Sequence, residues 1–254
     1  MTLGLIAIGA ITGFISAFFG IGGSSIDTPL LREFLHFPPY LALGTPLPTA
    51  FLTVTIALAA YWKMHLVNRK LFIYSIIGGT PGILAGSLSS GLFSGKTLML
   101  LTAVVLFSVG ISFITKSIHE RKRSEYRKSG IDKNILRGGK IAAVSGLAGF
   151  LSGVLANGGG LFLIPAYVIF FKINIKEAIA TSLSVVAVTI LPSCLIHYSL
   201  GHIDLAGSAA MGIGVVPMAY IGAKMDIRTK SSVIQALFGA MLIIFSVYFF
   251  FSQI

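Results

Sequence analysis

Long apolar stretches alternate with short polar ones along the whole chain. Runs with few or no charges occur near residues 3–20, 41–62, 71–94, 97–115, 141–171, 177–196, 205–223 and 232–252. Each run approaches or exceeds the roughly 20 residues that a helix needs to cross the hydrocarbon core of a bilayer. The pattern therefore predicts an all-α integral membrane protein.

Composition supports this prediction. Hydrophobic residues make up 55% of the 254 positions and charged residues 11%, against about 25% charged residues in a typical soluble domain. A soluble core cannot bury that much apolar surface, so the lipid bilayer is an expected partner.

The net charge of +11 raises the question of nucleic-acid binding. Nine of the 19 Lys and Arg residues lie in one segment, residues 116–140, and the others sit at the ends of apolar runs. Basic loops of membrane proteins stay in the cytoplasm, and this distribution follows that rule. We therefore interpret residues 116–140 as a cytoplasmic linker and the protein as a multi-pass protein of the cell membrane. We expect no nucleic-acid partner.

The chain also contains an internal repeat. A shift of 136 residues aligns its two halves without a gap, and the matches favour Gly, Pro, Ser and Thr over Leu and Ile. The matched pairs include Gly13 with Gly149, Ser16 with Ser152, Pro29 with Pro165, Thr45 with Thr181, Pro81 with Pro217 and Gly86 with Gly222. Since these residue types fix backbone shape, we predict two homologous membrane repeats, residues 1–115 and 141–254.

Each half opens with an apolar stretch that glycines interrupt, at GIGGSS (residues 20–25) and ANGGGL (residues 156–161). If this stretch crosses the membrane once, each half has four crossings and the halves are parallel. If it enters and returns as a re-entrant helix pair, each half adds three transmembrane helices and the halves are inverted.

Loop charges favour the inverted arrangement. With the linker inside, this arrangement leaves only Arg32 and Lys96 of the 19 basic residues outside. The parallel arrangement would also move Lys172, Lys176, Lys224, Arg228 and Lys230 outside. The positive-inside rule thus predicts inverted repeats with both termini outside, which is a transporter architecture with its site at the midplane.

The glycine runs are the candidate binding site. A helix that restarts after each run, over about residues 24–32 and 161–171, would present free N–H groups and its positive dipole end to an anion. Glycine would let the backbone approach the ligand closely. The candidate substrate-binding glycines are Gly20, Gly22, Gly23, Gly158, Gly159 and Gly160, with Ser24, Ser25 and Asn157 as neutral donors.

The sequence allows two interpretations of the role of each of three further residues. Thr45 and Thr181, at equivalent positions, are either substrate ligands or helix N-caps. Asp27 is an acidic residue within an apolar stretch, and acids inside a membrane are usually functional. It is either a proton-coupling group or an acceptor bonded within the re-entrant helix.

The remaining motifs give little evidence of function. Tyr61 and its equivalent His197 lie near predicted helix ends and are interpreted as interfacial anchors. The segment SGKT at residues 94–97 lacks the glycine spacing of a Walker A loop. No histidine has a carboxylate at metal-ligand spacing. We expect no cofactor, no metal and no enzymatic activity.

The repeated motifs resemble those of the TauE/SafE family of sulfite exporters. GFISAFFGIGGSSIDTPLL with ALGTPL in the first half corresponds to GFLSGVLANGGGLFLIPAYV with AIATSL in the second. The resemblance covers nearly the whole chain and places Thr181 and Ser182 in the element that follows the second glycine run. Ser24 in place of a glycine, Pro46 in place of a serine, and Ala156 and Asn157 depart from the family pattern.

The resemblance implies a secondary transporter of small sulfur-containing anions: sulfite, thiosulfate, sulfoacetate or another organosulfonate. An interior-negative potential of 100 mV drives each negative charge outward by roughly 2.3 kcal/mol, so export by alternating access needs no ATP. Import would need a proton or sodium ion. An anion channel, and a transporter of another small carboxylate or metabolite anion, are the alternatives. The oligomeric state stays open, a homodimer included.

Overall fold

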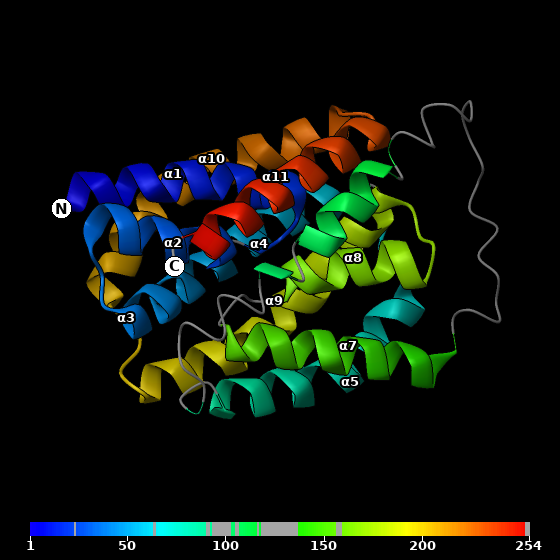
Figure 1. Ribbon diagram of the computed structural model, residues 1–254, viewed down its shortest axis with the longest axis horizontal. Coiled ribbons are helices and arrows are strands. Elements are labelled where there is room, and N and C mark those ends of the chain that lie inside the picture. The colour runs from blue at the N-terminus through cyan, green and yellow to red at the C-terminus, as the bar shows by residue number, and fades with distance from the viewer. Residues whose placement is uncertain are drawn as a thin grey trace. The chain divides into compact units, whose positions relative to one another are not determined.

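The computed structural model is helical throughout the part of the chain that it describes. That part comprises residues 1–22, 24–62, 65–89, 92, 103–104, 107–115, 117, 137–155 and 159–251, with the backbone alone for Ser25, Trp62 and Phe249. The helices, seen in Figure 1, are α1 (Thr2–Phe19), α2 (Ser24–Leu35), α3 (Pro39–Gly44), α4 (Pro46–Trp62), α5 (Arg69–Ser89), α7 (Gly138–Val154), α8 (Gly160–Phe170), α9 (Ile175–Ser199), α10 (Leu205–Arg228) and α11 (Ser231–Phe251).

Six of these helices are long and apolar enough to cross a bilayer. They are α1, α3 together with α4, α5, α9, α10 and α11. The apolar helices α7 and α8 are shorter. The protein is therefore an all-α, multi-pass integral membrane protein, as the apolar pattern predicts.

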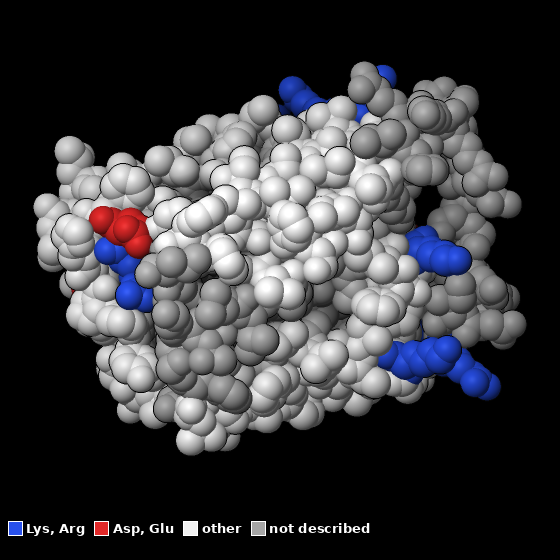
Figure 2. Space-filling view, in the orientation of Figure 1, with Lys and Arg blue, Asp and Glu red and all other residues white. Residues whose placement is uncertain are grey.

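Charged side chains lie at the ends of these helices. Arg69 and Lys70 open α5, Lys176 lies in the first turn of α9, and Arg228 lies in the last turn of α10. Figure 2 shows the described charged side chains of this face in a few small groups, with uncharged residues between them. Apolar helices with charges at their ends are what a bilayer requires.

The chain forms two compact units, and each unit contains residues from both sequence halves. The first unit comprises Met1–Ser90 and Ile131–Ile227, and the second comprises Gly91–Gly130 and Arg228–Ile254. In the second unit, the helical residues 107–115 pack against α11, where the rings of Phe113 and Phe238 lie 5.1 Å apart. Each half thus gives its last helix to the second unit, and both glycine runs belong to the first.

Each short helix that follows a glycine run folds back along the helix before it. A Cβ atom at Gly4, at the start of α1, would lie 3.1 Å from the Leu35 side chain, at the end of α2. In the second half, Ser145 of α7 and Tyr167 of α8 both donate hydrogen bonds of 2.8 Å to the Ser75 hydroxyl of α5. Both glycine runs are therefore the tips of helical hairpins.

The halves pack against each other through glycines. A Cβ atom at Gly78 of α5 would collide with the Ala142 carbonyl oxygen of α7, and one at Gly86 would collide with that of Phe150. Gly214 and Gly222 of α10 make the same contacts with Ile6 and Phe14 of α1. Each of these four contacts is matched by its equivalent at a shift of 136 residues.

These contacts fix helix direction. Residue numbers rise together along α5 and α7, and along α1 and α10, so the members of each pair run parallel. Figure 1 shows α5 and α7 side by side. A helix from one half therefore lies against a helix from the other half without intervening side chains, as small residues permit inside membranes.

We expect Gly78→Ala to destabilise the protein. The added methyl group meets backbone, which cannot rotate away, so overpacking should lower stability by about 1–3 kcal/mol. Gly139→Ala is the matched control, because no atom lies within 4 Å of its Cβ position. Thermal unfolding of both purified variants in detergent measures the difference, and equal unfolding temperatures would contradict the close contact of α5 with α7.

Candidate functional site

The two glycine runs are in direct contact. A Cβ atom at Gly160 would lie 2.6 Å from the Ile21 carbonyl oxygen and 2.8 Å from that of Gly20. Gly20, Gly22 and Gly159 have φ angles of 69°, 87° and 105°, a backbone conformation that other residues rarely adopt. Glycine is thus required here both for the turn and for the close approach.

One face of α9 covers this contact. A Cβ atom at Gly22 would lie 3.3 Å from Val186 Cγ1, and one at Gly159 would lie 3.3 Å from Val186 Cγ2. Gly20 is packed against Ile179, one turn before Ser182. Since residues three and four apart share a helix face, Ile179, Ser182 and Val186 all face the glycine runs.

Within the described part of this region, three buried serine hydroxyls have no hydrogen-bond partner: those of Ser24, Ser152 and Ser182. Ser24 is the first residue of α2, and Ser152 Oγ lies 3.9 Å from the Cβ position of Gly159. Nearly all buried polar atoms in proteins are hydrogen-bonded, so three unpaired donors in one region point to a bound ligand.

Two helix N-termini add further donors. The structure begins α2 at Ser24 and α8 at Gly160, directly after the glycine runs, while α2 extends to Leu35. The first N–H groups of a helix have no partner within the helix, and its dipole favours negative charge there. Hydroxyls and helix N-termini together can bind an anion without a charged side chain.

Thr45 and Thr181 bond to the opposite half. The Asp204 N–H donates to Thr45 Oγ1, and the Asn68 N–H donates to Thr181 Oγ1, each at 3.0 Å. Asn68 and Asp204 are equivalent in the repeat, so the two bonds are reciprocal. Thr181 lies inside α9 and not at its start.

Asn68 and Asp204 themselves precede α5 and α10. Asn68 Oδ1 accepts from the Leu71 N–H at 3.1 Å, and Asp204 Oδ1 accepts from the Ala206 N–H at 3.0 Å. Each threonine thereby holds the N-cap residue of a helix in the other half. These two contacts bind the two halves together.

Some of the predicted site residues lack a description. Gly23, Asn157 and Gly158 lie outside the described residues, and of Ser25 only the backbone within α2 is described. Of the predicted residues, Gly20, Gly22, Gly159 and Gly160 come together at the contact described above. Ser24 follows the first run as the first residue of α2, and Ser182 lies on the face of α9 that carries Ile179 and Val186.

Sequence reasoning missed Ser152 and Val186 as site residues. The sequence could have indicated Ser152, because this serine matches Ser16 in the repeat and precedes the glycine run. It could not have indicated Val186, because Val186 is one apolar residue among many in α9. Only its contact with both glycine runs distinguishes it.

The interfacial reading of Tyr61 and His197 was wrong, since both side chains are buried. His197 Nδ1 lies 3.1 Å from His202 Nδ1, in the connection between α9 and α10, and the His202 ring stacks on Tyr40 at 4.9 Å. Burial lowers the pKa of His202 and so favours its neutral ring near pH 7.

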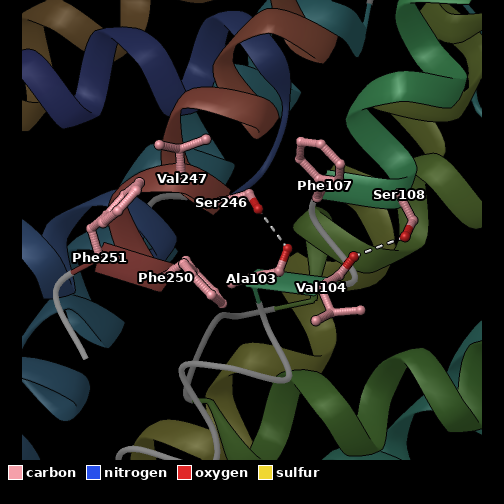
Figure 3. Close-up of a pocket in the computed structure, with 8 residues that line it drawn as sticks. All are labelled: Ala103, Val104, Phe107, Ser108, Ser246, Val247, Phe250 and Phe251. Carbon is pink, nitrogen blue, oxygen red and sulfur yellow. Dashed lines mark hydrogen bonds between the residues drawn. The ribbon is translucent and has the colours of Figure 1, made fainter. Parts of the chain in front are cut away.

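A cavity of about 280 Å³ lies in the second unit and is apolar (Figure 3). Its wall includes Phe107, Phe250 and Phe251. Its two hydroxyls already donate to backbone: Ser246 to the Ala103 carbonyl at 2.7 Å and Ser108 to that of Val104 at 2.9 Å. This cavity therefore offers no free polar group to an anion.

A membrane-embedded helical bundle with broken helices is typical of membrane transporters. The protein-family comparison agrees: the model "Sulfite exporter TauE/SafE" matches residues 5–249. The chain therefore belongs to the TauE/SafE family of membrane transporters.

Curated relatives are distant but match along most of their length. "Probable membrane transporter protein YunE" of Bacillus subtilis (strain 168) is 26% identical, over 87% of this chain and 85% of its own. YjnA of the same organism is 23% identical over 96% and 98%. A probable membrane transporter protein of Xylella fastidiosa (strain 9a5c) is 27% identical over 96% and 92%. No solved structure matches the chain significantly.

We expect Thr181→Val to destabilise the protein by about 1–3 kcal/mol, because it leaves the Asn68 N–H without its acceptor. Thr189→Val is the matched control on the same helix, since Thr189 Oγ1 donates only to the Val185 carbonyl of its own turn. Thermal unfolding in detergent measures both. If the control loses as much stability as Thr181→Val, the bond between the halves contributes nothing.

Proposed function

We propose that this protein is a secondary transporter of small sulfur-containing anions, such as sulfite, thiosulfate, sulfoacetate or another organosulfonate. The name of its family supports the substrate class. The observation that carries the proposal is the meeting of the two glycine runs beside three unpaired serine hydroxyls.

In this proposal the anion binds between the tips of the two hairpins. Backbone N–H groups at the starts of α2 and α8 surround it, with Ser24, Ser152 and Ser182 as hydroxyl donors. Oxyanions suit such a site because each oxygen accepts several hydrogen bonds. A site of neutral donors also releases a dianion more readily than one with a buried Lys or Arg would.

The helix directions support inverted repeats. The first hairpin reverses the chain, so α2 is antiparallel to α1. The span of α3 and α4 then crosses in the direction of α1, and α5 returns in the opposite direction, antiparallel to α1. Because α7 runs parallel to α5, it is antiparallel to α1, its own equivalent. We therefore propose that residues 1–115 and 141–254 are inverted repeats, with residues 116–140 cytoplasmic and both termini outside.

Inverted repeats provide a mechanism of alternating access. Their two-fold axis lies in the membrane plane, and the site at that axis can face either side as the surrounding helices rock. Export is the direction we propose, because an interior-negative potential favours it by roughly 2.3 kcal/mol per charge per 100 mV.

Flux measurements in proteoliposomes test the proposal. Vesicles would be loaded with labelled sulfite, thiosulfate or sulfoacetate, with the membrane potential clamped by potassium and valinomycin. We expect saturable flux that follows the potential for at least one of the three anions. Flux that rises without saturation would favour an anion channel, and selective flux of acetate or another carboxylate would favour a different substrate class.

We expect Gly159→Leu to reduce this flux at least tenfold, because its side chain would enter the space beside Val186. Gly201→Leu is a control matched for backbone strain, since Gly201 also has a positive φ of 70° but has no atom within 4 Å. Both variants should insert and purify alike. Normal flux in Gly159→Leu would rule out a site at the glycine runs.

A further inference from the structure

Asp27 is an acid buried within the α1–α2 hairpin. It lies in the first turn of α2 and its side chain is 1% exposed. One carboxyl oxygen, Oδ1, has no hydrogen-bond partner. The unpaired hydroxyl of Ser24 lies three residues earlier on the same helix, next to the glycine run.

Thr12 of α1 is the side chain that contacts this acid. Thr12 Oγ1 also lies 2.9 Å from the Ile8 carbonyl oxygen of its own helix. A hydroxyl has one proton, so Thr12 cannot donate fully to both acceptors, and it leaves the Asp27 carboxyl incompletely satisfied.

Among the described residues, the helices packed against Asp27 bring no cation to it. Helix α2 packs against α1, α3 and α4; α1 has no titratable side chain, and the others bring only Tyr40 and Tyr61. On α2 itself, Arg32 and Glu33 lie more than one turn further along. Asp226 and Lys224 belong to α10, which contacts α1. An ionised carboxylate without a partner is costly in such a place.

We propose that Asp27 is a proton-binding site that couples proton movement to anion transport, as a symporter. This inference rests on the proposed function. An ionised Asp27 would repel an anion at the start of α2, and a protonated one would not. Anion binding and proton binding therefore strengthen each other, and by linkage the effect is reciprocal.

The step balances without any further reactant. The carboxylate takes a proton from water on one side of the membrane, forming one O–H bond, and returns that proton to water on the other side. The equivalent position in the second half is Leu163, so the repeat provides no second acid at this place. A different buried acid with unpaired oxygens, Asp226, lies near the end of α10. One proton should accompany each anion, and a dianion should cross with one net negative charge.

Thiosulfate is a suitable probe, because it stays a dianion across the neutral pH range. In proteoliposomes, labelled thiosulfate and internal pH would be followed together, and the voltage of zero net flux would be measured at known gradients. We expect one net charge and one proton per anion for the unaltered protein. Asp27→Asn, which can bond to Thr12 but cannot release a proton, should move two charges per anion and no proton.

Glu33→Gln is the matched control, because Glu33 is an exposed acid on the same helix. It should keep one proton per anion. Proton-free flux in the unaltered protein, unchanged coupling in Asp27→Asn, or coupling that requires sodium in place of protons would each overturn the proposal while leaving anion transport intact.

Infrared spectroscopy of the purified protein separates this inference from the transport proposal. At neutral pH we expect a protonated-carboxyl band that is weaker in Asp27→Asn and unchanged in Glu33→Gln, because Asp226 is a second buried acid that can contribute to the band. If no thiosulfate moves in the unaltered protein, the transport proposal fails for this anion, and the part of the band lost in Asp27→Asn still decides the state of Asp27. An unchanged band in Asp27→Asn would overturn the assignment of the proton to Asp27.

Discussion

The structure depends on one constraint: backbone that leaves the helical conformation inside a bilayer must find its partners within the protein. Lipid supplies neither donors nor acceptors, so the glycine runs can exist only where protein covers them. The two runs cover each other, with Gly160 against the carbonyls of Gly20 and Ile21, and α9 closes over them through Ile179 and Val186. The same arrangement that satisfies the backbone brings two helix N-termini together.

Neither half could build this region alone. The glycine contacts between α5 and α7, and between α1 and α10, each pair a helix of one half with a helix of the other. The hydrogen bonds from Asn68 to Thr181 and from Asp204 to Thr45 do the same. Contacts between the halves, and not within one of them, therefore build the centre of this unit.

The hydroxyl groups of this region divide into two kinds. Thr45 and Thr181 each accept a backbone N–H from the other half and hold the halves together. Ser24, Ser152 and Ser182 have no hydrogen-bond partner in the described part of the chain, and in our proposal they bind the anion. The halves also differ chemically where they are equivalent in position: Asp27 has Leu163 as its counterpart, and Ser182 has Pro46. A symmetric backbone thus carries an asymmetric set of polar groups, which an ion-coupled transporter can use.

The sequence alone determined the membrane class, the two-fold repeat and the position of the glycine runs, because length, hydropathy and the spacing of Gly and Pro are local properties. It also located the helix starts at Ser24 and near Leu161, since glycine interrupts a helix wherever it clusters. Only the tertiary structure decided what each hydroxyl does. Thr181 and Ser182 are neighbours in the sequence, yet one bonds to Asn68 in the other half and the other faces the glycine runs. Side-chain partners more than 100 residues away leave no trace in local pattern, and for the same reason neither Val186 nor the burial of His197 could be predicted.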